Sequence, residues 1–318
     1  MLPHSETLFD THAHLISDDW DRYPPRPLRA DLPVPSRTGY HVTAEALIGM
    51  MNAHEVATAC VVQRGHLYGH DNSYIIDAAR RYPDRLLPVV MLDTQHPETP
   101  ARFTDMVRNQ RVRGFRMANT RPAHLDTAWM SSPAALQVWQ ACADLDVPMT
   151  LIIFQNQLPY VLPLLHIIAK MFPMLPILID HLGTPYGATL VEMNWARDSG
   201  VTGRLLMPPA PDFGIHKFIG RFRDTPNVHF KLTEVNMERL YENGVPADKL
   251  IRRMADEFGA ERLLWGSDVG QSLRWSYGEK AAMGRAAGQL LNARERAAFL
   301  HDTAARLYRA ADATASDS

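Results

Sequence analysis

The chain has 318 residues, of which 46% are hydrophobic and 21% charged, and its formal net charge is −2 at pH 7. This composition excludes a largely disordered chain, and without a basic block in the sequence nucleic acid is not an expected partner. The length suits two ordinary domains or one α/β barrel, and no stretch approaches the ~18 uninterrupted apolar residues of a membrane span.

Residues 1–7 lack the basic and then apolar pattern of a signal peptide, so we expect a cytoplasmic protein that has no membrane partner. The two cysteines of the sequence, Cys60 and Cys142, lie in apolar segments. Two such residues make neither a disulfide framework nor a zinc knuckle, and we interpret them as small core residues.

The first predicted strand, at 8–15, contains His12 and His14 one residue apart. Side chains two apart on a strand point to the same face, so both imidazoles should project together, in line with Asp10. Two imidazoles side by side indicate a metal site or a cationic pocket, because an apolar interior offers them no partners. A chance pair in a chain of 14 histidines is the alternative.

The next segment, residues 16–41, is rich in Pro, Arg and Asp and has no helical or alternating period. A segment of this length without regular structure is typical of a binding loop or lid. Five of its side chains are candidates to meet an anionic ligand, although solvation at the surface explains each of them equally well: Arg22, Tyr23, Arg26, Arg29 and Arg37.

Strands and helices then alternate along the chain. A helix is predicted at 43–54 with Thr43 as its cap, and an apolar strand at 57–63 precedes Arg64 and His66. Further strands are predicted at 86–92, 112–117, 148–154, 176–181, 227–233 and 262–268. Further helices are predicted at 71–82, 98–109, 133–145, 159–171, 247–258, 279–291 and 293–309, the third with Ser132 as cap and Pro133 in its first turn. The last six residues are expected to be disordered.

Eight apolar strands separated by helices indicate parallel pairing with helical crossovers. Eight units over this length favour a (β/α)₈ TIM barrel, in the α/β class, over an open doubly wound sheet. The sequence has no Gly-x-Gly-x-x-Gly after the first strand, which argues against a dinucleotide fold. We therefore expect one domain over 1–318, with the barrel at about 8–309.

In such a barrel the carboxyl ends of the strands meet at one mouth. The polar residues predicted there are His12, His14, Arg64, His66, Arg116, His181, Lys231 and Asp268. Alternation places His181 on the face of Ile177 and Ile179, and Asp268 on the face of Leu264 and Gly266. Three imidazoles and one carboxylate, from His12, His14, His181 and Asp268, could bind Zn²⁺ or a similar ion, or could transfer protons without one.

Four motifs carry a resemblance to a known family: FDTHAH at 9–14, IDHLG at 179–183, LWGSD at 264–268 and DTAARLY at 302–308. Together they resemble the amidohydrolase superfamily. Within it the chain is most similar to the amidohydrolase-related (amidohydrolase 2) branch, which includes 2-pyrone-4,6-dicarboxylate lactonase, other enol-lactone hydrolases and several decarboxylases. The resemblance runs from about residue 8 to residue 308.

Two departures from the family pattern bear on the metal. Binuclear members carry a lysine at the end of strand 4, where this chain has Arg116, so two metal ions are disfavoured. Many mononuclear members place a histidine at the end of strand 5, where this chain has Ile153, Phe154 and Gln155. The resemblance therefore implies either one divalent ion, most readily Zn²⁺, or catalysis without a tightly held ion.

The leading hypothesis is hydrolysis of a carboxylated lactone of the 2-pyrone-dicarboxylate or muconolactone type. Asp268 would act as general base, while His12, His14 and His181, directly or through Zn²⁺, would polarise the carbonyl. The substrate would be bound by Arg64, His66, Arg116 and Lys231, because a guanidinium fork fits a carboxylate. Structural ion pairs are the alternative for the two arginines, and Lys231 could instead pair with Asp268 or Glu234.

Two other functions fit the sequence. One keeps the fold but changes the reaction to metal-dependent decarboxylation or hydration of an aromatic or unsaturated acid. The other is a barrel that binds a small acid without turning it over. In every case the expected partner is a small carboxylated molecule, and the sequence leaves a homo-oligomer open.

Overall fold

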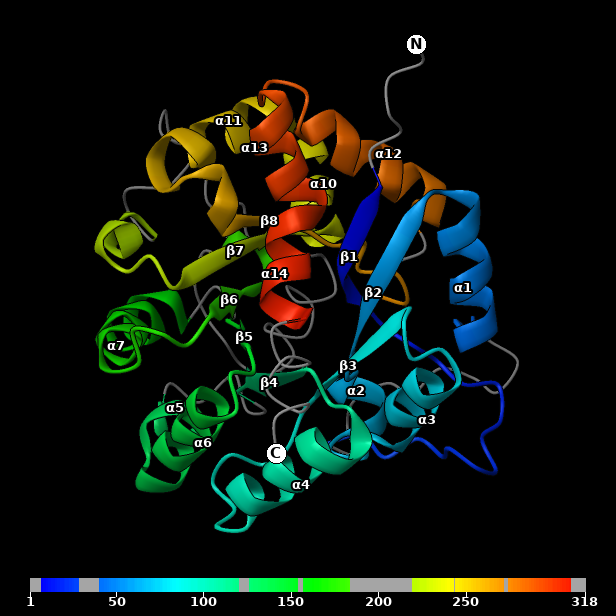
Figure 1. Cartoon of the computed structure of the whole chain (residues 1–318), viewed down its shortest axis with the longest axis vertical. Coiled ribbons are helices and arrows are strands. Elements are labelled where there is room, and N and C mark those ends of the chain that lie inside the picture. Colours follow the sequence, from blue (N-terminus) through cyan, green and yellow to red (C-terminus); the bar gives the residue numbers. More distant parts are fainter. Residues whose placement is uncertain are drawn as a thin grey trace.

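The computed structural model describes residues 7–28, 40–119, 126–153, 157–183, 219–242, 244–271 and 274–309. Eight parallel strands form one sheet, in chain order from β1 to β8, with helices outside it (Figure 1). The strands are β1 (Leu8–Ala13), β2 (Val56–Val62), β3 (Leu86–Val90), β4 (Gly114–Ala118), β5 (Met149–Ile152), β6 (Ile177–Ile179), β7 (Val228–Leu232) and β8 (Leu263–Trp265). The predicted (β/α)₈ barrel is confirmed.

The barrel closes between β1 and the segment that follows β8. The Thr11 hydroxyl donates to the Trp265 carbonyl at 2.6 Å. Beyond the last residue of β8, the Asp268 amide donates to the His12 carbonyl at 2.7 Å, and the His14 amide donates to the Val269 carbonyl at 2.8 Å. The closing hydrogen bonds therefore lie at the carboxyl ends of the strands.

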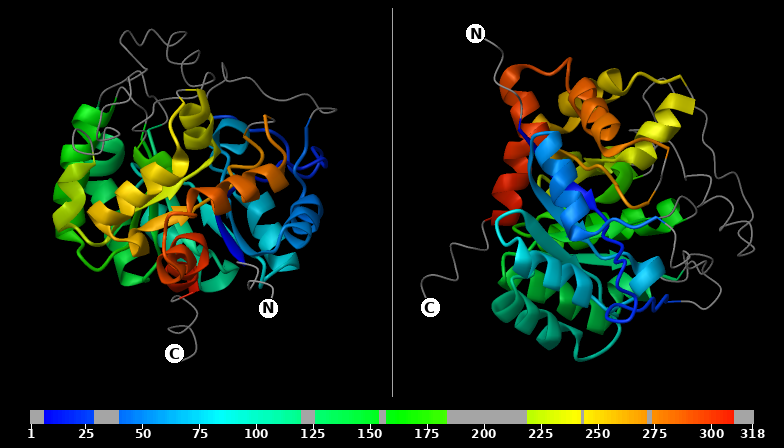
Figure 2. Two further views of the ribbon diagram at one scale, coloured as in Figure 1. Left: turned by 90° about the horizontal axis from the view of Figure 1, so that it is seen from above. Right: turned by 90° about the vertical axis from the view of Figure 1, so that its right-hand side faces the viewer.

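The helices surround the sheet, as the two views of Figure 2 show. They are α1 (Ala44–Ala53), α2 (Gly65–Tyr68), α3 (Ser73–Arg81), α4 (Thr99–Gln110), α5 (Ala128–Ser131), α6 (Pro133–Asp144), α7 (Leu158–Met171), α10 (Glu234–Glu242), α11 (Ala247–Phe258), α12 (Tyr277–Ala287), α13 (Ala293–Ala297) and α14 (Thr303–Arg309). A π-helical turn, Ala298–Asp302, joins α13 to α14. Among the described residues, no helix is both long and apolar enough to cross a membrane.

Both predicted helix caps are confirmed. The Thr43 side chain accepts a hydrogen bond from the Ala46 amide at 3.1 Å, and the Ser132 side chain accepts one from the Ala135 amide at 3.2 Å. The predicted helices omit α2, α5 and α10. The first two have only four residues each, which is too short to show a period, and in α10 buried polar residues interrupt the apolar pattern.

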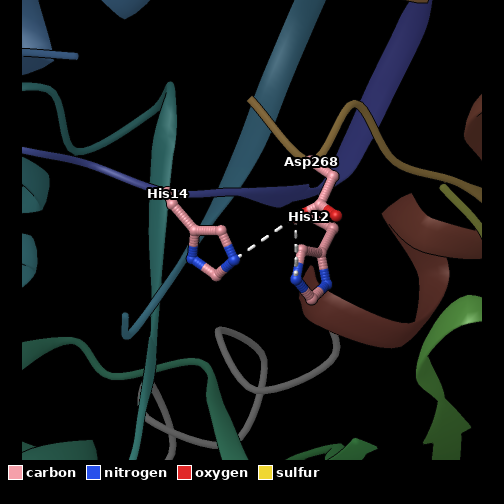
Figure 3. Close-up of side chains that lie close together, drawn as sticks. All are labelled: His12, His14 and Asp268. Carbon is pink, nitrogen blue, oxygen red and sulfur yellow. Dashed lines mark ion pairs between the residues drawn. The ribbon is translucent and has the colours of Figure 1, made fainter. Parts of the chain in front are cut away.

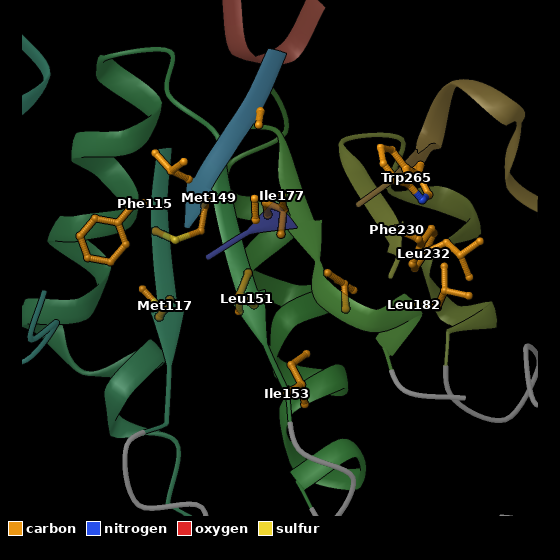
Figure 4. Packing of buried hydrophobic residues seen from close by; sticks show 14 of the residues in the cluster. Phe115, Met117, Met149, Leu151, Ile153, Ile177, Leu182, Phe230, Leu232 and Trp265 are labelled. Atoms are coloured by element: carbon orange, nitrogen blue, oxygen red, sulfur yellow. The ribbon is translucent and has the colours of Figure 1, made fainter. Parts of the chain in front are cut away.

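Two hydrophobic clusters fill the fold. The larger cluster joins the outward faces of the strands to the helices, and Figure 4 shows residues such as Phe115, Met149 and Phe230 in it. The smaller cluster lies inside the barrel at the amino ends of the strands, where Phe9 stacks on Tyr308 of α14 with ring centroids 6.0 Å apart. Cys60 and Cys142 are buried free thiols, as predicted.

The strand predicted at 176–181 is too long, because β6 ends at Ile179, and the reason concerns the site. Residues 180–183 leave the sheet in a tight turn in which His181 and Leu182 have φ of 56° and 53°. Leu178 belongs to the cluster inside the barrel, whereas Ile177 and Ile179 face the helices. The prediction that His181 shares an inward face with these two isoleucines is therefore wrong, because the left-handed turn redirects the chain.

The cap of α6 gives a stability prediction. Replacing Ser132 with alanine removes the side-chain acceptor of the Ala135 amide, so the free energy of unfolding should fall by about 1 kcal/mol. Urea unfolding followed by circular dichroism measures the change. The control is Thr104→Ala within α4, where the hydroxyl bonds only the Pro100 carbonyl of its own helix, and the expected change is under about 0.5 kcal/mol. Equal losses in the two variants would contradict the role of the cap.

Candidate active site

Three predicted residues meet at the mouth of the barrel, and we call them the central cluster: His12, His14 and Asp268 (Figure 3). Their possible ligand atoms all lie within 4.8 Å of one another, and all three side chains are buried. The Oδ1 atom of Asp268 lies 3.3 Å from His14 Nε2 and 3.7 Å from His12 Nε2. Both imidazoles are thus directed at the same carboxylate oxygen.

The contacts of His14 fix the position of its proton. Its Nδ1 atom lies 2.8 Å from the Val62 carbonyl oxygen, which can only accept a hydrogen bond. In the neutral ring the proton is therefore on Nδ1, and a bare Nε2 faces Asp268. This is the form in which a histidine binds a metal ion or accepts a proton.

Burial determines the charges in the central cluster. Burial lowers the pKa of His12 to about 3 and also lowers the pKa of His14, so both rings are neutral at pH 7. For Asp268, burial acts to raise the pKa, but the close contact of His14 and the nearby rings of His12 and His181 hold it below the usual range. The cluster is therefore an ionised carboxylate between two neutral imidazoles.

The central cluster fits a single cation. Both oxygens of Asp268 and both ring nitrogens of His12 are buried without a hydrogen-bond partner among the described residues. The acceptors that converge in this buried space are Nε2 of His12, Nε2 of His14 and Oδ1 of Asp268. They need a cation or proton donors between them. Ligands of a tetrahedral Zn²⁺ are about 3.4 Å apart, which resembles the 3.3 and 3.7 Å separations here.

The predicted fourth ligand, His181, lies beside the central cluster. Its ring centroid is 5.5 Å from that of His12, and its Nδ1 is 2.6 Å from the Thr233 hydroxyl. The Asn236 amide donates to the His181 carbonyl at 2.8 Å and supports the turn. Strained backbone of this kind persists where the surroundings over-determine it, often at functional sites. Ligation by His181 stays a prediction.

Sequence reasoning missed the role of Asp180, whose carboxylate is fully buried next to the central cluster. Its Oδ2 accepts from Arg116 Nε at 3.2 Å and lies 3.2 Å from Nη2, while its Oδ1 lies 3.3 Å from both Lys231 Nζ and His12 Nδ1. Burial acts to raise the pKa of Asp180, but Lys231, His12 and Arg116 hold it well below the usual range. The sequence signal that could have revealed this role is a carboxylate directly after a buried apolar strand.

Two expected pairings of Lys231 are wrong. Its ammonium group is fully buried, contacts Asp180 and donates to the Thr11 carbonyl at 3.1 Å, so it reaches neither Asp268 nor Glu234. Glu234 instead pairs with Lys280 of α12 at 2.6 Å. Strand alternation could not distinguish these partners, because it says nothing of the depth that a side chain reaches.

Asp10 was expected to project with the two histidines, and this was also wrong. Its carboxylate accepts hydrogen bonds from the Ser267 amide at 2.8 Å, the Ser267 hydroxyl at 2.5 Å, the Tyr277 hydroxyl at 3.1 Å and the His12 amide at 3.0 Å. Through these hydrogen bonds the Asp10 carboxylate joins β1 to the segment after β8. Asp10 is therefore not in the central cluster.

The substrate-binding candidates lie in different surroundings. Arg64 begins the turn into α2, its guanidinium is largely buried, and Nε has no hydrogen-bond partner among the described residues. Burial lowers the pKa of Arg64, while the charge of nearby Asp268 acts in the opposite direction. Arg116 is bound to Asp180, and His66 is exposed on α2. Of these side chains, Arg64 is the cation that lies near the central cluster and is available to bind a ligand.

Other candidates fall away from the site or outside the described residues. The Arg22 guanidinium and the Tyr23 hydroxyl both contact Asp77 of α3 at 2.8 Å, and Arg26 pairs with Asp71 at 3.6 Å. The exposed side chains of Arg22 and Arg26 agree with the surface interpretation, whereas Tyr23 is buried and belongs to the core. Arg29, Arg37, Phe154, Gln155 and the last six residues lie outside the described part of the chain.

The comparison with known families fits this geometry. The amidohydrolase family model matches residues 9–310, which include all of the barrel strands except Leu8 and all three residues of the central cluster. The chain belongs to the amidohydrolase family. The resemblance inferred from the four sequence motifs is thereby confirmed.

Relatives of this amidohydrolase include proteins of several kinds. L-Fucono-1,5-lactonase from Burkholderia ambifaria is 26% identical over 199 residues, which are 62% of this chain and 60% of that protein. The match thus spans less than two thirds of the curated relative. A probable 2-pyrone-4,6-dicarboxylic acid hydrolase from Acinetobacter baumannii, with citric acid bound, has a similar structure at 18% identity, TM-score 0.67, covering 95% of this chain and 99% of that one.

Two further solved structures contain metal ions. An amidohydrolase from Burkholderia multivorans with bound zinc is 21% identical, with TM-score 0.65 over 95% of this chain and 99% of that one. A 5-carboxyvanillate decarboxylase from Novosphingobium aromaticivorans with manganese is 16% identical, with TM-score 0.61 over 96% and 97%. At these identities the similarity shows a shared fold and does not choose between the reactions.

The close approach of β8 to His12 gives a second prediction. A Cβ added at Gly266 would lie 2.7 Å from His12 Cβ and 3.0 Å from the His12 backbone nitrogen. Gly266→Ala should therefore lower the free energy of unfolding by about 1–3 kcal/mol, because backbone must move to make room. Gly49→Ala is the matched control, since a Cβ there meets no atom within 4 Å in α1. It should be neutral or stabilising by up to about 1 kcal/mol. Similar urea midpoints for both variants would contradict this account.

Proposed function

We propose that this amidohydrolase hydrolyses a lactone that carries at least one carboxylate. The observation that carries the proposal is the buried Asp268 carboxylate, ionised and without a hydrogen-bond partner for either oxygen among the described residues, with two neutral imidazoles directed at it. Such a carboxylate is suited to accept a proton from water. Arg64 beside it supplies a positive charge for a substrate anion.

In the proposed mechanism the chain's own residues move one proton. Asp268 takes a proton from water as the water oxygen bonds to the lactone carbonyl carbon. The ring C–O bond then breaks, and Asp268 returns the proton to the departing ring oxygen, so that one water is consumed and a hydroxy acid is formed. His181 lies beside the central cluster, where it can donate a hydrogen bond to the developing oxyanion.

The metal belongs to the same proposal. His12, His14 and Asp268 would hold one divalent ion, and His181 next to them would then be a further ligand instead of a hydrogen-bond donor. When bound there, such an ion polarises a carbonyl and lowers the pKa of water. Zinc suits two imidazole nitrogens and a carboxylate oxygen.

We rank the substrate-binding candidates by the contacts that each side chain already makes. Arg64 is the first candidate for the substrate carboxylate, because two nitrogens of Arg116 are already held by Asp180. His66, exposed on α2, would act at the rim. Lys231 is buried against Asp180, and we assign it to that carboxylate instead of the substrate.

The named relatives support the substrate class. A lactonase and a probable 2-pyrone-dicarboxylic acid hydrolase are both similar to this chain, and both names describe ring esters of polar acids. The second candidate is a metal-dependent decarboxylase, because a decarboxylase shares the fold. An assay with carboxylated pyrones and muconolactones as substrates distinguishes the two reactions. Ultraviolet absorbance measures consumption of the lactone, and CO₂ release is measured alongside. Hydrolysis consumes the lactone without releasing CO₂.

Asp268→Asn tests the proton acceptor. The amide cannot accept the proton, so kcat for lactone hydrolysis should fall by about 10²–10⁴-fold, while binding of the substrate acid, measured by calorimetry, persists. Asp84→Asn, an exposed carboxylate after α3, is the control and should leave the rate unchanged. An unchanged rate in the Asp268 variant would eliminate the general-base role.

Removal of the metal tests whether the reaction requires the ion. We expect chelation to lower the rate of lactone hydrolysis by about 100-fold or more and added Zn²⁺ to restore it, because the ion polarises the carbonyl. Elemental analysis before and after chelation confirms the removal. Full activity in protein shown to be free of metal would exclude an essential ion and would also count against the decarboxylase alternative.

A further inference from the structure

Asp180 joins the site to four strands of the barrel. It follows β6, and its contacts reach His12 of β1, Arg116 of β4 and Lys231 of β7. All four side chains are buried, with exposed fractions of 0–7% for the residues. Within the described residues Asp180 touches the central cluster only through the far side of the His12 ring.

We propose that Asp180 is a positioning residue that holds the proton of His12 on Nδ1 and so presents a bare Nε2 to the reaction centre. This inference rests on the proposed function and deepens it. Asp180 Oδ1 lies 3.3 Å from His12 Nδ1, and His12 Nε2 lies on the side of Asp268, 3.7 Å from its Oδ1. A carboxylate has no proton to donate, so the favourable arrangement places the proton on Nδ1.

The two cations fix the direction of the Asp180 carboxylate. Arg116 binds Oδ2 through two nitrogens, and its Nη1 also donates to the Gln63 carbonyl at 3.4 Å. Lys231 is anchored by the Thr11 carbonyl at 3.1 Å and contacts Oδ1. Because both oxygens are held, the carboxylate cannot rotate away from His12. The positive charges also keep it ionised in a buried place, where an unpaired carboxylate would take up a proton.

The two histidines of the central cluster are therefore oriented by different acceptors. His14 Nδ1 is hydrogen-bonded to a neutral carbonyl, that of Val62, at 2.8 Å, while His12 Nδ1 makes an electrostatic contact of 3.3 Å with a charged carboxylate. A carboxylate behind an imidazole raises the basicity of the ring and its strength as a ligand, and loss of such a partner typically costs 10–100-fold in metal affinity. His14 provides an internal control, because its acceptor does not depend on Asp180.

The test is the position of the ring protons, measured by long-range ¹H–¹⁵N NMR on protein with ¹⁵N-labelled histidine at pH 7.5. The signals of His12 and His14 are assigned by their loss in His12→Gln and His14→Gln. In the unaltered protein we expect both rings to carry the proton on Nδ1. A His12 ring protonated on Nε2 overturns the proposal, and this measurement needs no variant of Asp180.

Asp180→Asn then tests causation. The amide can donate to Nδ1, so the proton of His12 should shift towards Nε2 while that of His14 stays in place, and the Kd for Zn²⁺ should rise by about 10–100-fold. Glu234→Gln is the matched control, because it removes the charge of another buried carboxylate that pairs with a lysine but does not contact His12, so stability falls and the His12 tautomer persists. An unchanged His12 tautomer and an unchanged Zn²⁺ affinity in a folded Asp180→Asn protein also overturn the proposal.

These readouts separate the inference from the proposed function. The tautomer and the Zn²⁺ affinity are measured without a substrate, so failure to hydrolyse any lactone would leave them unaffected. If Asp180→Asn does not fold, as judged by circular dichroism, the tautomer in the unaltered protein decides. For a folded variant, a fall in kcat with little change in KM is expected, because the residue does not touch the substrate.

Discussion

The site depends on the hydrogen bonds that join β1 to the chain beyond β8. The Asp268 amide donates to the His12 carbonyl, and the His14 amide donates to the Val269 carbonyl. The backbone of Asp268 is thus bonded to that of His12, and its neighbour Val269 is bonded to His14, although the two segments lie more than 250 positions apart. Closure of the barrel and assembly of the site are therefore the same event.

Asp10 reinforces that closure from behind. It collects four hydrogen bonds, two of them from Ser267, and it is fully buried. Burial raises the pKa of Asp10, opposed by those hydrogen bonds. The same barrel mouth contains the Asp180 network, in which two cations surround one carboxylate. Several buried polar groups therefore hold His12 and Asp268 in register. Apolar packing alone does not achieve this.

Sequence patterns predicted the strands because buried parallel strands are short apolar runs bounded by polar residues. They also predicted His12, His14 and Asp268, because strand ends converge in a barrel. They could not predict the turn at 180–183, where positive φ angles replace the alternation that had assigned the face of His181. Nor could they assign the partners of Lys231 or the helix α10, because in both places ion pairs and hydrogen bonds bury polar side chains against the usual pattern.

The π-helical turn and α14 end with Tyr308 inside the amino end of the barrel, stacked on Phe9. On the described residues this end is plugged, so a molecule that enters at the strand carboxyl ends must leave by the same way. Under the proposed hydrolysis, the ring-opened product would carry one more anionic group than its precursor and would depart past Arg64. A barrel that is closed at one end would then make the reaction prone to inhibition by its own product, because the spent molecule and the next substrate would share a single route.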